Sequence, residues 1–319
     1  MALDPQAAAL LAALAGMPAP DYSRLDAASY RAALAAGGGV ASAIGPGDAV
    51  GAEEDLTLPG AAGPLAARLY RPINSAGAGD AKGQALPLLV FFHGGGFVAC
   101  GLDTHANLCR TLAARARTLV LSVDYRLAPE ARFPAAAHDA LAAVRWAAAH
   151  AAELGAVPGA LAVAGDSAGG NLAAVCAQQL RGEVAIAHQL LLYPVLDNAH
   201  EHPSYETYGS GHLLDADLMR WFRDQYFEPQ ADRASPLASP LGMERLEQVA
   251  PATIVSAECD PLRDEAEHYA ARLAQAGVPV TLVRWPGQMH GFASMLGVLD
   301  AASAALDLGA RALRAALHP

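Results

Sequence analysis

The sequence has little charge, and its charge is mostly of one sign. Only 17% of the residues are charged, and 21 Lys and Arg stand against 32 Asp and Glu, which gives a formal net charge of −11. No basic cluster stands out along the chain. Nucleic-acid backbones and anionic membrane surfaces are bound through clustered cations. We therefore expect no nucleic-acid partner and no attraction to an anionic membrane surface.

Cysteine is also scarce, and the four cysteines are far apart. They are Cys100, Cys109, Cys176 and Cys259, and no two of them form a CxxC pair. Zinc sites and disulfide frameworks are built from cysteines at characteristic spacings, and this spacing supports neither. We expect structural thiols in a reducing compartment and no metal site.

Long hydrophobic runs are missing as well. No stretch of about 20 uninterrupted apolar residues is present to cross a membrane. The N-terminal stretch MALDPQAAALLAALAG is apolar, but secretory signal peptides begin with cationic residues, and Asp4 and Pro5 occupy that region here. We therefore expect a cytoplasmic protein with no stable membrane insertion.

The sequence does contain enough apolar residues for a sizeable core. They make up 53% of the chain, which excludes a disordered protein. Short apolar runs typical of buried strands lie at Leu86–Phe92, Thr118–Tyr125, Ala160–Ala164, Gln189–Val195, Thr253–Glu258 and Val280–Trp285. Helical segments lie between or after them, at His105–Arg117, Ala135–His150, Asn171–Arg181, Arg263–Ala276 and Leu299–Leu317. This alternation predicts an α/β protein with a mostly parallel sheet covered by helices on both faces.

Three segments depart from that alternation. Residues 1–45 contain two Ala-rich helical stretches that end at a glycine run, and residues 74–85 are rich in Gly, Ala and Ser, as in a surface hairpin or loop. Residues 196–250 form an insertion between two core strands, with one helical stretch near Asp215–Phe227. Ligands of open α/β sheets bind at the carboxyl ends of the strands. We therefore expect residues 1–45 and the insertion to form a cap over a catalytic domain of residues 46–319.

One short segment has the pattern of a nucleophilic serine. Gly165, Asp166, Ser167, Ala168 and Gly169 match G-x-S-x-G, and they lie between a predicted strand and a predicted helix. That strand–turn–helix setting is the one expected for a nucleophile elbow, and the helix N-terminus favours developing negative charge on Ser167. The alternatives are a glycine-rich turn and a phosphate-binding loop between strand and helix.

A second glycine-rich segment can supply hydrogen-bond donors for the reaction. His93, Gly94, Gly95 and Gly96 follow the first buried strand, and HGGG loops of this kind form oxyanion holes in lipases and esterases. We assign the donors to the N–H groups of Gly95, Gly96 and Ala168. We expect His93, Gly94 and Asp166 to support the loop. The alternative is a flexible glycine linker.

Asp260 and His290 complete the predicted catalytic group. Asp260 ends the strand TIVSAEC, and His290 lies just after the strand VTLVRW, in the stretch MHGF. The order Ser167, Asp260, His290 along the chain is that of the α/β hydrolases. The competing residues are His200, His202 and His212 for the base and Asp264 and Glu265 for the acid.

The chain resembles the bacterial hormone-sensitive-lipase-like esterases of the α/β-hydrolase fold. The resemblance rests on FFHGGGF, VDYRLAPE, GDSAGGNLAA, YPVLD, DPLRDE and HGF, which lie in the family's order between residues 91 and 292. It implies that YRLAPE packs against the HGGG loop and that Asp166 forms a hydrogen bond near Ser167. It also implies that Asp260 is the acid of the catalytic group and that a cap covers the site. The family further implies short- to medium-chain ester substrates, no cofactor and frequent homodimers.

These inferences predict a serine carboxylesterase that forms an acyl-enzyme. The same machinery also suits an amidase, a lactonase or a carbamate hydrolase, and a metal hydrolase is a further alternative. Plant gibberellin receptors resemble this family without being enzymes, but they lack the histidine that is present here as His290. The cap contains five aromatic residues that either form its own core or line a substrate pocket: Tyr205, Tyr208, Trp221, Phe222 and Phe227.

Overall fold

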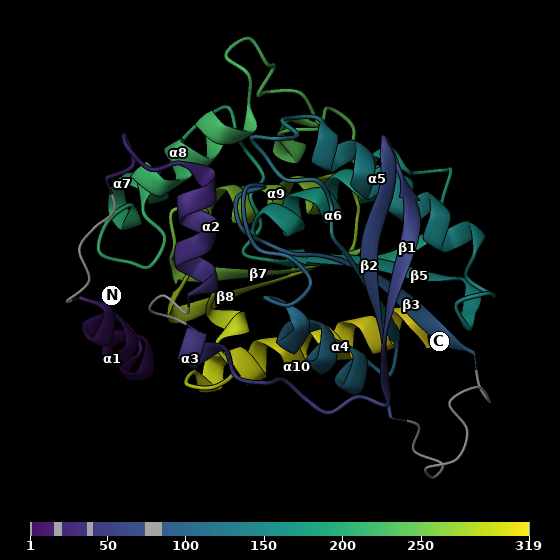
Figure 1. Ribbon diagram of the computed structural model, residues 1–319. Coiled ribbons are helices and arrows are strands. Elements are labelled where there is room, and N and C mark those ends of the chain that lie inside the picture. The colour runs from purple at the N-terminus through teal and green to yellow at the C-terminus, as the bar shows by residue number, and fades with distance from the viewer. Residues whose placement is uncertain (1, 16–20, 37–40, 74–84, 319) are drawn as a thin grey trace.

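A single eight-stranded sheet runs through the protein. The computed structural model describes residues 2–15, 21–36, 41–73 and 85–318 (Figure 1). The strands are β1 Ala52–Gly60, β2 Gly63–Arg71, β3 Leu86–Phe92, β4 Leu119–Val123, β5 Ala156–Asp166, β6 Ile186–Leu192, β7 Ala252–Cys259 and β8 Val280–Met289. They are arranged in the order β1-β2-β4-β3-β5-β6-β7-β8. From β4 to β8 in this order, the strands are parallel to one another. β2 is antiparallel to both of its neighbours, β1 and β4.

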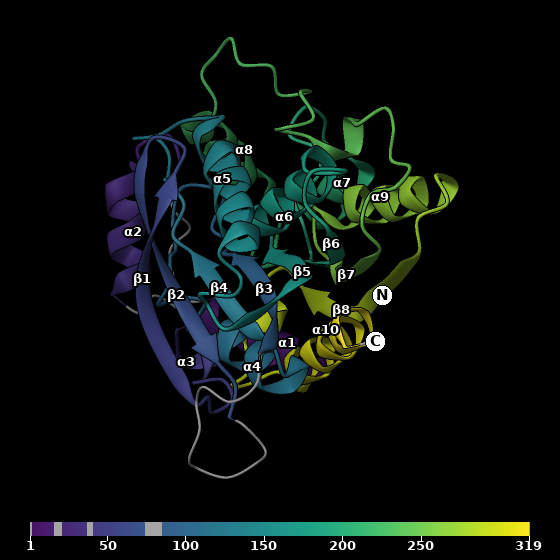
Figure 2. The same cartoon turned by 90° about the vertical axis from the view of Figure 1, so that its right-hand side faces the viewer.

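Helices cover both faces of this sheet. Figures 1 and 2 show α4 and α10 on one face, and α5, α6 and α9 on the other. These helices span Ala106–Ala116 (α4), Asp300–Leu317 (α10), Ala135–Ala149 (α5), Ala168–Gln179 (α6) and Arg263–Gln275 (α9). A separate hydrophobic cluster fills each interface. The predicted α/β class is therefore confirmed.

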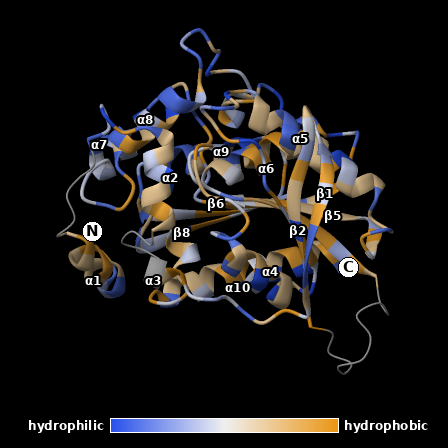
Figure 3. Cartoon of the chain, viewed as in Figure 1, coloured by the Kyte–Doolittle hydropathy of each residue, from blue (hydrophilic) through white to orange (hydrophobic). Residues whose placement is uncertain are grey.

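Burial on both faces explains why the central strands were readable from the sequence. Every residue of β4 and β7 is buried, and β3 is buried except at Leu86. A strand covered on both sides is apolar throughout, without alternation. Figure 3 shows hydrophobic colouring along the sheet and hydrophilic stretches on the outer helices.

The hairpin of β1 and β2 was not predicted. β1 is an edge strand in which exposed and half-buried residues alternate, and it includes Glu53, Glu54 and Asp55. Such a strand has no apolar run, because only one face meets the core. Glu53 and Asp55 on the other face are exposed. The loop predicted at 74–85 follows this hairpin and, apart from Ala85, lies outside the described residues.

The N-terminal segment divides into pieces with different neighbours. It contains α1 Pro5–Leu14, α2 Ala27–Ala35 and the short α3 Ala41–Ile44. α1 lies beside β8 and α10, where the Asp4 N–H donates to the Gly287 carbonyl at 3.0 Å and the Gln6 amide contacts Asp300. α2 instead packs against the insertion. The glycine run at residues 37–39, where the second helical stretch was predicted to end, lies outside the described residues.

The insertion after β6 carries α7 Pro203–Tyr208, α8 Ala216–Tyr226 and a 3₁₀ turn at Pro240–Gly242. The helix predicted near Asp215–Phe227 is confirmed as α8, whose first turn is capped by the Asp215 carboxylate. The shorter α7 was not predicted. Figure 1 shows α2 next to α8. In the described ranges, each helix is too short or too polar to span a bilayer.

Candidate active site

Ser167 lies in a strained turn between β5 and α6. Its backbone has φ 53° and ψ −120°, a conformation that L-residues rarely adopt. The flanking glycines make this turn possible: a Cβ at Gly165 would lie 2.2 Å from the Gly169 carbonyl oxygen, and one at Gly169 would lie 1.9 Å from that of Phe92. The G-x-S-x-G pattern therefore reflects close backbone packing, as expected of a nucleophile elbow.

His290 links Ser167 to Asp260. Its Nε2 lies 2.9 Å from the Ser167 Oγ, and its Nδ1 lies 2.8 Å from an Asp260 carboxylate oxygen. A carboxylate only accepts hydrogen bonds, so Nδ1 carries the proton and Nε2 accepts from the serine hydroxyl. Asp260 is fully buried, and its other oxygen accepts from the Leu262 N–H at 2.9 Å. The three predicted side chains therefore converge, although 123 positions separate Ser167 from His290.

The HGGG loop is attached to the serine turn through Asp166. The Gly94 N–H donates to the Asp166 carboxylate at 2.9 Å, and a Cβ at Gly94 would lie 2.5 Å from that carboxylate. Burial tends to raise the pKa of Asp166, but nearby His105 and His93 and the Gly94 N–H lower it below its ordinary value. Asp166 is therefore a buried anion that fixes the loop. His105, which sequence reasoning gave no role, lies 3.2 Å from it.

The HGGG loop and the serine turn together carry three backbone N–H groups that the sequence predicted as oxyanion donors. Within the described residues, the N–H groups of Gly95, Gly96 and Ala168 have no hydrogen-bond acceptor. Gly95 and Gly96 have φ values of 109° and 63°, which favour glycine. A Cβ at Gly96 would also lie 2.3 Å from the Phe222 ring. Unpaired N–H groups of this kind are available to a reacting carbonyl oxygen.

His93 is a packing residue of this loop. Its ring stacks on Tyr125 with 4.3 Å between centroids, and the Tyr125 hydroxyl donates to the His93 carbonyl at 2.8 Å. Burial, with a smaller effect from His105, lowers the pKa of His93 to about 4. The ring is therefore neutral near pH 7. The packing of the tyrosine of YRLAPE against HGGG agrees with the expectation from the family resemblance.

The residues considered as alternatives to His290 and Asp260 have other hydrogen-bond partners. His200 and His202 each lie 3.1 Å from the Asp197 carboxylate, and the His212 ring contacts the Ser210 carbonyl. The two competing acids accept backbone N–H groups of the insertion: Asp264 from Ser204 at 2.9 Å and Glu265 from Leu196 at 2.7 Å. None of these five side chains is bonded to Ser167.

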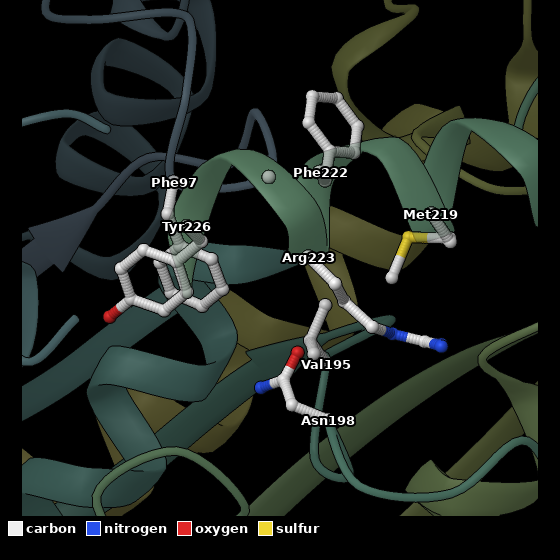
Figure 4. Close-up of a pocket in the computed structure, with 8 residues that line it drawn as sticks. Phe97, Val195, Asn198, Met219, Phe222, Arg223 and Tyr226 are labelled. Atoms are coloured by element: carbon white, nitrogen blue, oxygen red, sulfur yellow. The ribbon is translucent and has the colours of Figure 1, made fainter. Parts of the chain in front are cut away.

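Four of the five aromatic residues predicted to form the cap's core or to line a substrate pocket are buried, namely Tyr205, Trp221, Phe222 and Phe227. The Trp221 indole donates to the Leu25 carbonyl, the Tyr205 hydroxyl accepts from Arg223, Phe227 packs against Phe133, and Tyr208 lies against Arg263. Phe222 differs, because it lines a small cavity beside Gly96 (Figure 4). The lining residues are Gly96, Phe97, Val195, Asn198, Met219, Phe222, Arg223 and Tyr226.

Sequence reasoning missed two residues that border the reacting centre. The Tyr193 ring lies edge-on to His290, with 4.9 Å between centroids, and burial raises its pKa well above the ordinary value. Two positions later, the Val195 N–H donates to the Ser167 carbonyl at 3.0 Å. Both belong to the stretch YPVLD, which carried the family resemblance without indicating these contacts. All four cysteines are free thiols. Over the described ranges, no group of three or more His, Cys, Asp or Glu is arranged to hold a metal ion.

Known proteins similar to this chain include ester hydrolases. An ethyl acetate hydrolase of Pseudomonas putida is 43% identical over 253 residues, which cover 78% of each chain. A carboxylic ester hydrolase of Mycobacterium tuberculosis is 46% identical over 272 residues, 82% of this chain and 70% of that one.

Solved structures of esterases superpose on this protein along almost its whole length. An ester hydrolase from the metagenome of Lake Arreo, complexed with a derivative of bipyridine phosphonate, superposes with a TM-score of 0.92 at 36% identity and covers 99% of this chain and 100% of that chain. A hyperthermophilic esterase from Pyrobaculum calidifontis gives 0.89 at 39% identity and covers 99% of each chain. A family model described as alpha/beta hydrolase fold matches residues 89–294, more than half of the chain. The chain therefore belongs to the α/β-hydrolase fold family, in its hormone-sensitive-lipase-like group of esterases.

Proposed function

We propose that this protein is a serine carboxylesterase that hydrolyses short- to medium-chain esters through an acyl-enzyme. The observation that carries the proposal is the chain of contacts from the Ser167 hydroxyl to His290 at 2.9 Å and from His290 to Asp260 at 2.8 Å. Such a chain activates a serine hydroxyl, which is otherwise a weak nucleophile. Relatives that are named ester hydrolases support the same activity.

The first half of the reaction forms the acyl-enzyme. The Ser167 oxygen attacks the ester carbonyl carbon while His290 Nε2 takes the hydroxyl proton. The carbonyl oxygen becomes negatively charged, and the N–H groups of Gly95, Gly96 and Ala168 stabilise that charge. His290 then gives its proton to the alcohol oxygen, and the alcohol leaves. In the second half, His290 takes a proton from a water molecule, whose oxygen attacks the acyl carbon. His290 then returns that proton to the Ser167 oxygen as its bond to the acyl carbon breaks, and the acid leaves.

Asp260 has two roles in this proposal. Its carboxylate keeps the proton of neutral His290 on Nδ1, so that Nε2 is free to accept the proton of the Ser167 hydroxyl. When His290 becomes positively charged, the buried carboxylate stabilises it. The hydrogen bond from the Leu262 N–H holds the carboxylate in place.

The residues around the reacting centre support the proposed preference for esters with short to medium carbon chains. The cavity beside Gly96 is narrow, and Phe222 rests directly on the glycine. We propose that α2 and residues 196–250 together form a cap, since Tyr30 of α2 contacts both Trp221 and Phe222 of α8 at 5.2 and 5.6 Å between centroids. A cap closed by aromatic packing favours small uncharged substrates, because burying an unpaired charge is costly.

The decisive variant is Ser167→Ala. We expect it to lower kcat for simple esters by about 10⁴-fold or more while the fold is retained. A p-nitrophenyl ester series from acetate to decanoate measures both the loss and the chain-length preference, and circular dichroism checks the fold. An organophosphate should label wild type at Ser167 and leave the variant unlabelled.

Ser210→Ala is the matched control, because Ser210 is an exposed serine in the insertion. It should keep wild-type kcat. Near-normal turnover by Ser167→Ala would refute the proposal.

We further propose a cytoplasmic location and a homodimer. Four free thiols, three of them buried, fit a reducing compartment, and dimers are frequent in the resembling family. Cell fractionation tests the location, and sedimentation equilibrium tests the dimer. Secreted enzyme would contradict the first expectation, and a monomer at micromolar concentration would contradict the second.

A further inference from the structure

Two of the proposed oxyanion donors lie in a strained turn. The Val98 N–H donates to the Gly95 carbonyl at 3.0 Å, which closes the turn of residues 95–98. Gly95 and Gly96 have positive φ values, and so does Phe97, with φ 63°. A bulky residue rarely adopts this conformation, which persists only where surrounding contacts enforce it. The contacts that hold the 95–98 turn therefore also fix the direction of the Gly96 N–H.

Helix α8 of the insertion contacts two residues of this turn. The Phe222 ring lies against Gly96, where an added Cβ would be 2.3 Å from it. The Tyr226 ring stacks on that of Phe97, with 4.0 Å between centroids and 8° between planes (Figure 4). Both rings of this stacked pair are buried. Residues four apart share one face of a helix, so a single face of α8 covers the middle of the turn.

Helix α2 of the N-terminal segment contacts the end of the turn through Arg31. The Arg31 Nε donates to the Val98 carbonyl at 2.7 Å, and its Nη2 donates to the Ala128 carbonyl at 2.7 Å. Val98 and Ala128 are fully buried, and neither carbonyl has another donor among the described residues. The Ala128 N–H donates in turn to the Phe97 carbonyl at 2.9 Å. A buried carbonyl is costly without a donor, so Arg31 ties both segments to α2.

Glu130 fixes the orientation of the Arg31 side chain. Its two carboxylate oxygens accept from Nη1 and Nη2, each at 2.8 Å. A bidentate pair of this kind restricts the planar guanidinium to one orientation. These hydrogen bonds lower the pKa of Glu130 to about 2, so its carboxylate stays charged at neutral pH. All three Arg31 nitrogens therefore have acceptors, and two of them hold backbone carbonyls.

We propose that Arg31 is a positioning residue of the oxyanion hole and holds the 95–98 turn so that the Gly96 N–H faces the reacting oxygen. The proposal rests on the carboxylesterase function proposed above. Arg31 acts through the Val98 and Ala128 carbonyls, and the two aromatic rings of α8 hold the same turn from the insertion. The cap therefore takes part in stabilising the transition state, in addition to covering the substrate.

The test is Arg31→Met, which keeps an unbranched apolar side chain and removes every hydrogen bond of the guanidinium. Active sites are first labelled to completion with an organophosphate, so that kcat is expressed per reactive serine. For p-nitrophenyl butanoate, kcat should fall about 10- to 100-fold, because a misplaced donor no longer stabilises the oxyanion. KM should change by less than about threefold.

A trifluoromethyl ketone, 1,1,1-trifluoro-2-heptanone, gives a second readout. The Ser167 oxygen bonds to its carbonyl carbon, His290 takes the hydroxyl proton, and the carbonyl oxygen becomes an anion that needs the same donors as the ester intermediate. Its inhibition constant should rise in Arg31→Met by about the factor by which kcat/KM falls. The acid limb of the pH profile should stay in place, because His290 keeps its contacts with Ser167 and Asp260.

Two further variants separate the turn from the cap as a whole. Arg31→Lys supplies one ammonium group in place of the planar fork, and kcat should fall only about threefold. It also carries the test if the methionine variant fails to fold. Tyr22→Phe is the control, because the Tyr22 hydroxyl links the N-terminal segment to Asp215 of the insertion at 3.1 Å without contacting the turn. It should keep the wild-type kcat and inhibition constant.

The outcomes distinguish this proposal from the proposed function. Wild-type kcat and an unchanged inhibition constant in both Arg31 variants would overturn the positioning role, and so would a loss confined to KM. Equal losses in Tyr22→Phe and Arg31→Met would also overturn it, because they would assign the effect to the cap as a whole. A wild type that hydrolyses no ester and takes no organophosphate label would instead refute the esterase function.

Discussion

At the scale of single residues, the reacting centre is built from backbone conformations that few side chains tolerate. Ser167 is held at a positive φ by close backbone contacts on both sides, and Gly96 has φ 63° with the Phe222 ring against it. Strained positions of this kind persist only where surrounding contacts enforce them. Here they hold the Ser167 hydroxyl against His290, and they leave the Gly96 N–H without an acceptor among the described residues.

Gly96→Ala should therefore damage catalysis. The added Cβ would lie 2.3 Å from the Phe222 ring, so either the ring or the loop must move and the Gly96 N–H loses its position. We expect kcat to fall by about 10²–10³-fold, the effect of losing one oxyanion donor, with a smaller change in KM. Steady-state kinetics on a p-nitrophenyl ester measures both.

The control is Gly211→Ala. Gly211 also has a positive φ, 75°, but a Cβ there meets nothing within 4 Å. It shares the backbone strain of Gly96→Ala without the collision, so kcat should stay near wild type. If kcat fell equally in the two variants, backbone strain alone would explain the loss. The argument that the Gly96 N–H must be held in position would then fail.

At the scale of elements, the segment joining β7 to α9 connects the proposed catalytic acid with the insertion. Asp260 begins this segment, and Glu265, five residues later, accepts the N–H of Leu196 at the start of the insertion. Fully buried Ser204 of α7 donates to the Pro261 carbonyl at 2.5 Å, and the Asp264 N–H donates to Ser204 at 3.3 Å. The position of Asp260 therefore depends on contacts made by the insertion.

Ser204→Ala should lower kcat about tenfold with little change in KM. The variant leaves the Pro261 carbonyl buried without its donor, so the segment carrying Asp260 shifts. The same loss should reduce the free energy of unfolding by about 1–2 kcal/mol. Thr207→Ala on the same helix is the control, because Thr207 is exposed and bonds only within α7. A Ser204 variant that loses stability but keeps kcat would rule out the positioning role.

At the scale of the whole molecule, the sheet buries titratable groups that make stability depend on pH. His188 of β6 is 7% exposed and contacts the Thr253 hydroxyl of β7 at 2.9 Å. Burial lowers its pKa from 6.5 to about 4. The unfolded chain therefore binds a proton below pH 6.5 that the folded protein does not bind until about pH 4, and acid favours unfolding across that range.

His188→Gln should remove this part of the acid sensitivity. Between pH 7.5 and pH 5, we expect wild type to lose about 1–2 kcal/mol more free energy of unfolding than the variant. Urea unfolding gives the free energy of unfolding of both proteins at each pH. The two losses are then compared, and the contributions of the other titratable groups cancel because both proteins contain them. The exposed His318→Gln serves as the control and should lose as much stability as wild type. Parallel losses in wild type and His188→Gln would contradict the prediction.

The parts of the site that were predictable from the sequence are those with local causes. The serine turn needs glycines at fixed positions around Ser167, and the HGGG loop needs glycines directly after a strand. Fully buried strands leave continuous apolar runs, so their ends, where Asp260 and the serine turn lie, can be located. Because the strands are parallel, those ends meet at one edge of the sheet, which is why side chains so distant along the chain were expected to converge.

Other features depend on contacts that leave no local pattern. The half-exposed hairpin of β1 and β2, the bond from Ser204 to Pro261 and the separate neighbours of α1 and α2 could not be predicted. The same is true of the Arg223 Nε, which is buried without an acceptor among the described residues. The sequence by itself determined the chemistry of the reacting groups, because short-range backbone geometry demands particular residues. Only the tertiary structure decided what surrounds them, since the partners of a buried polar atom are set by how distant segments pack.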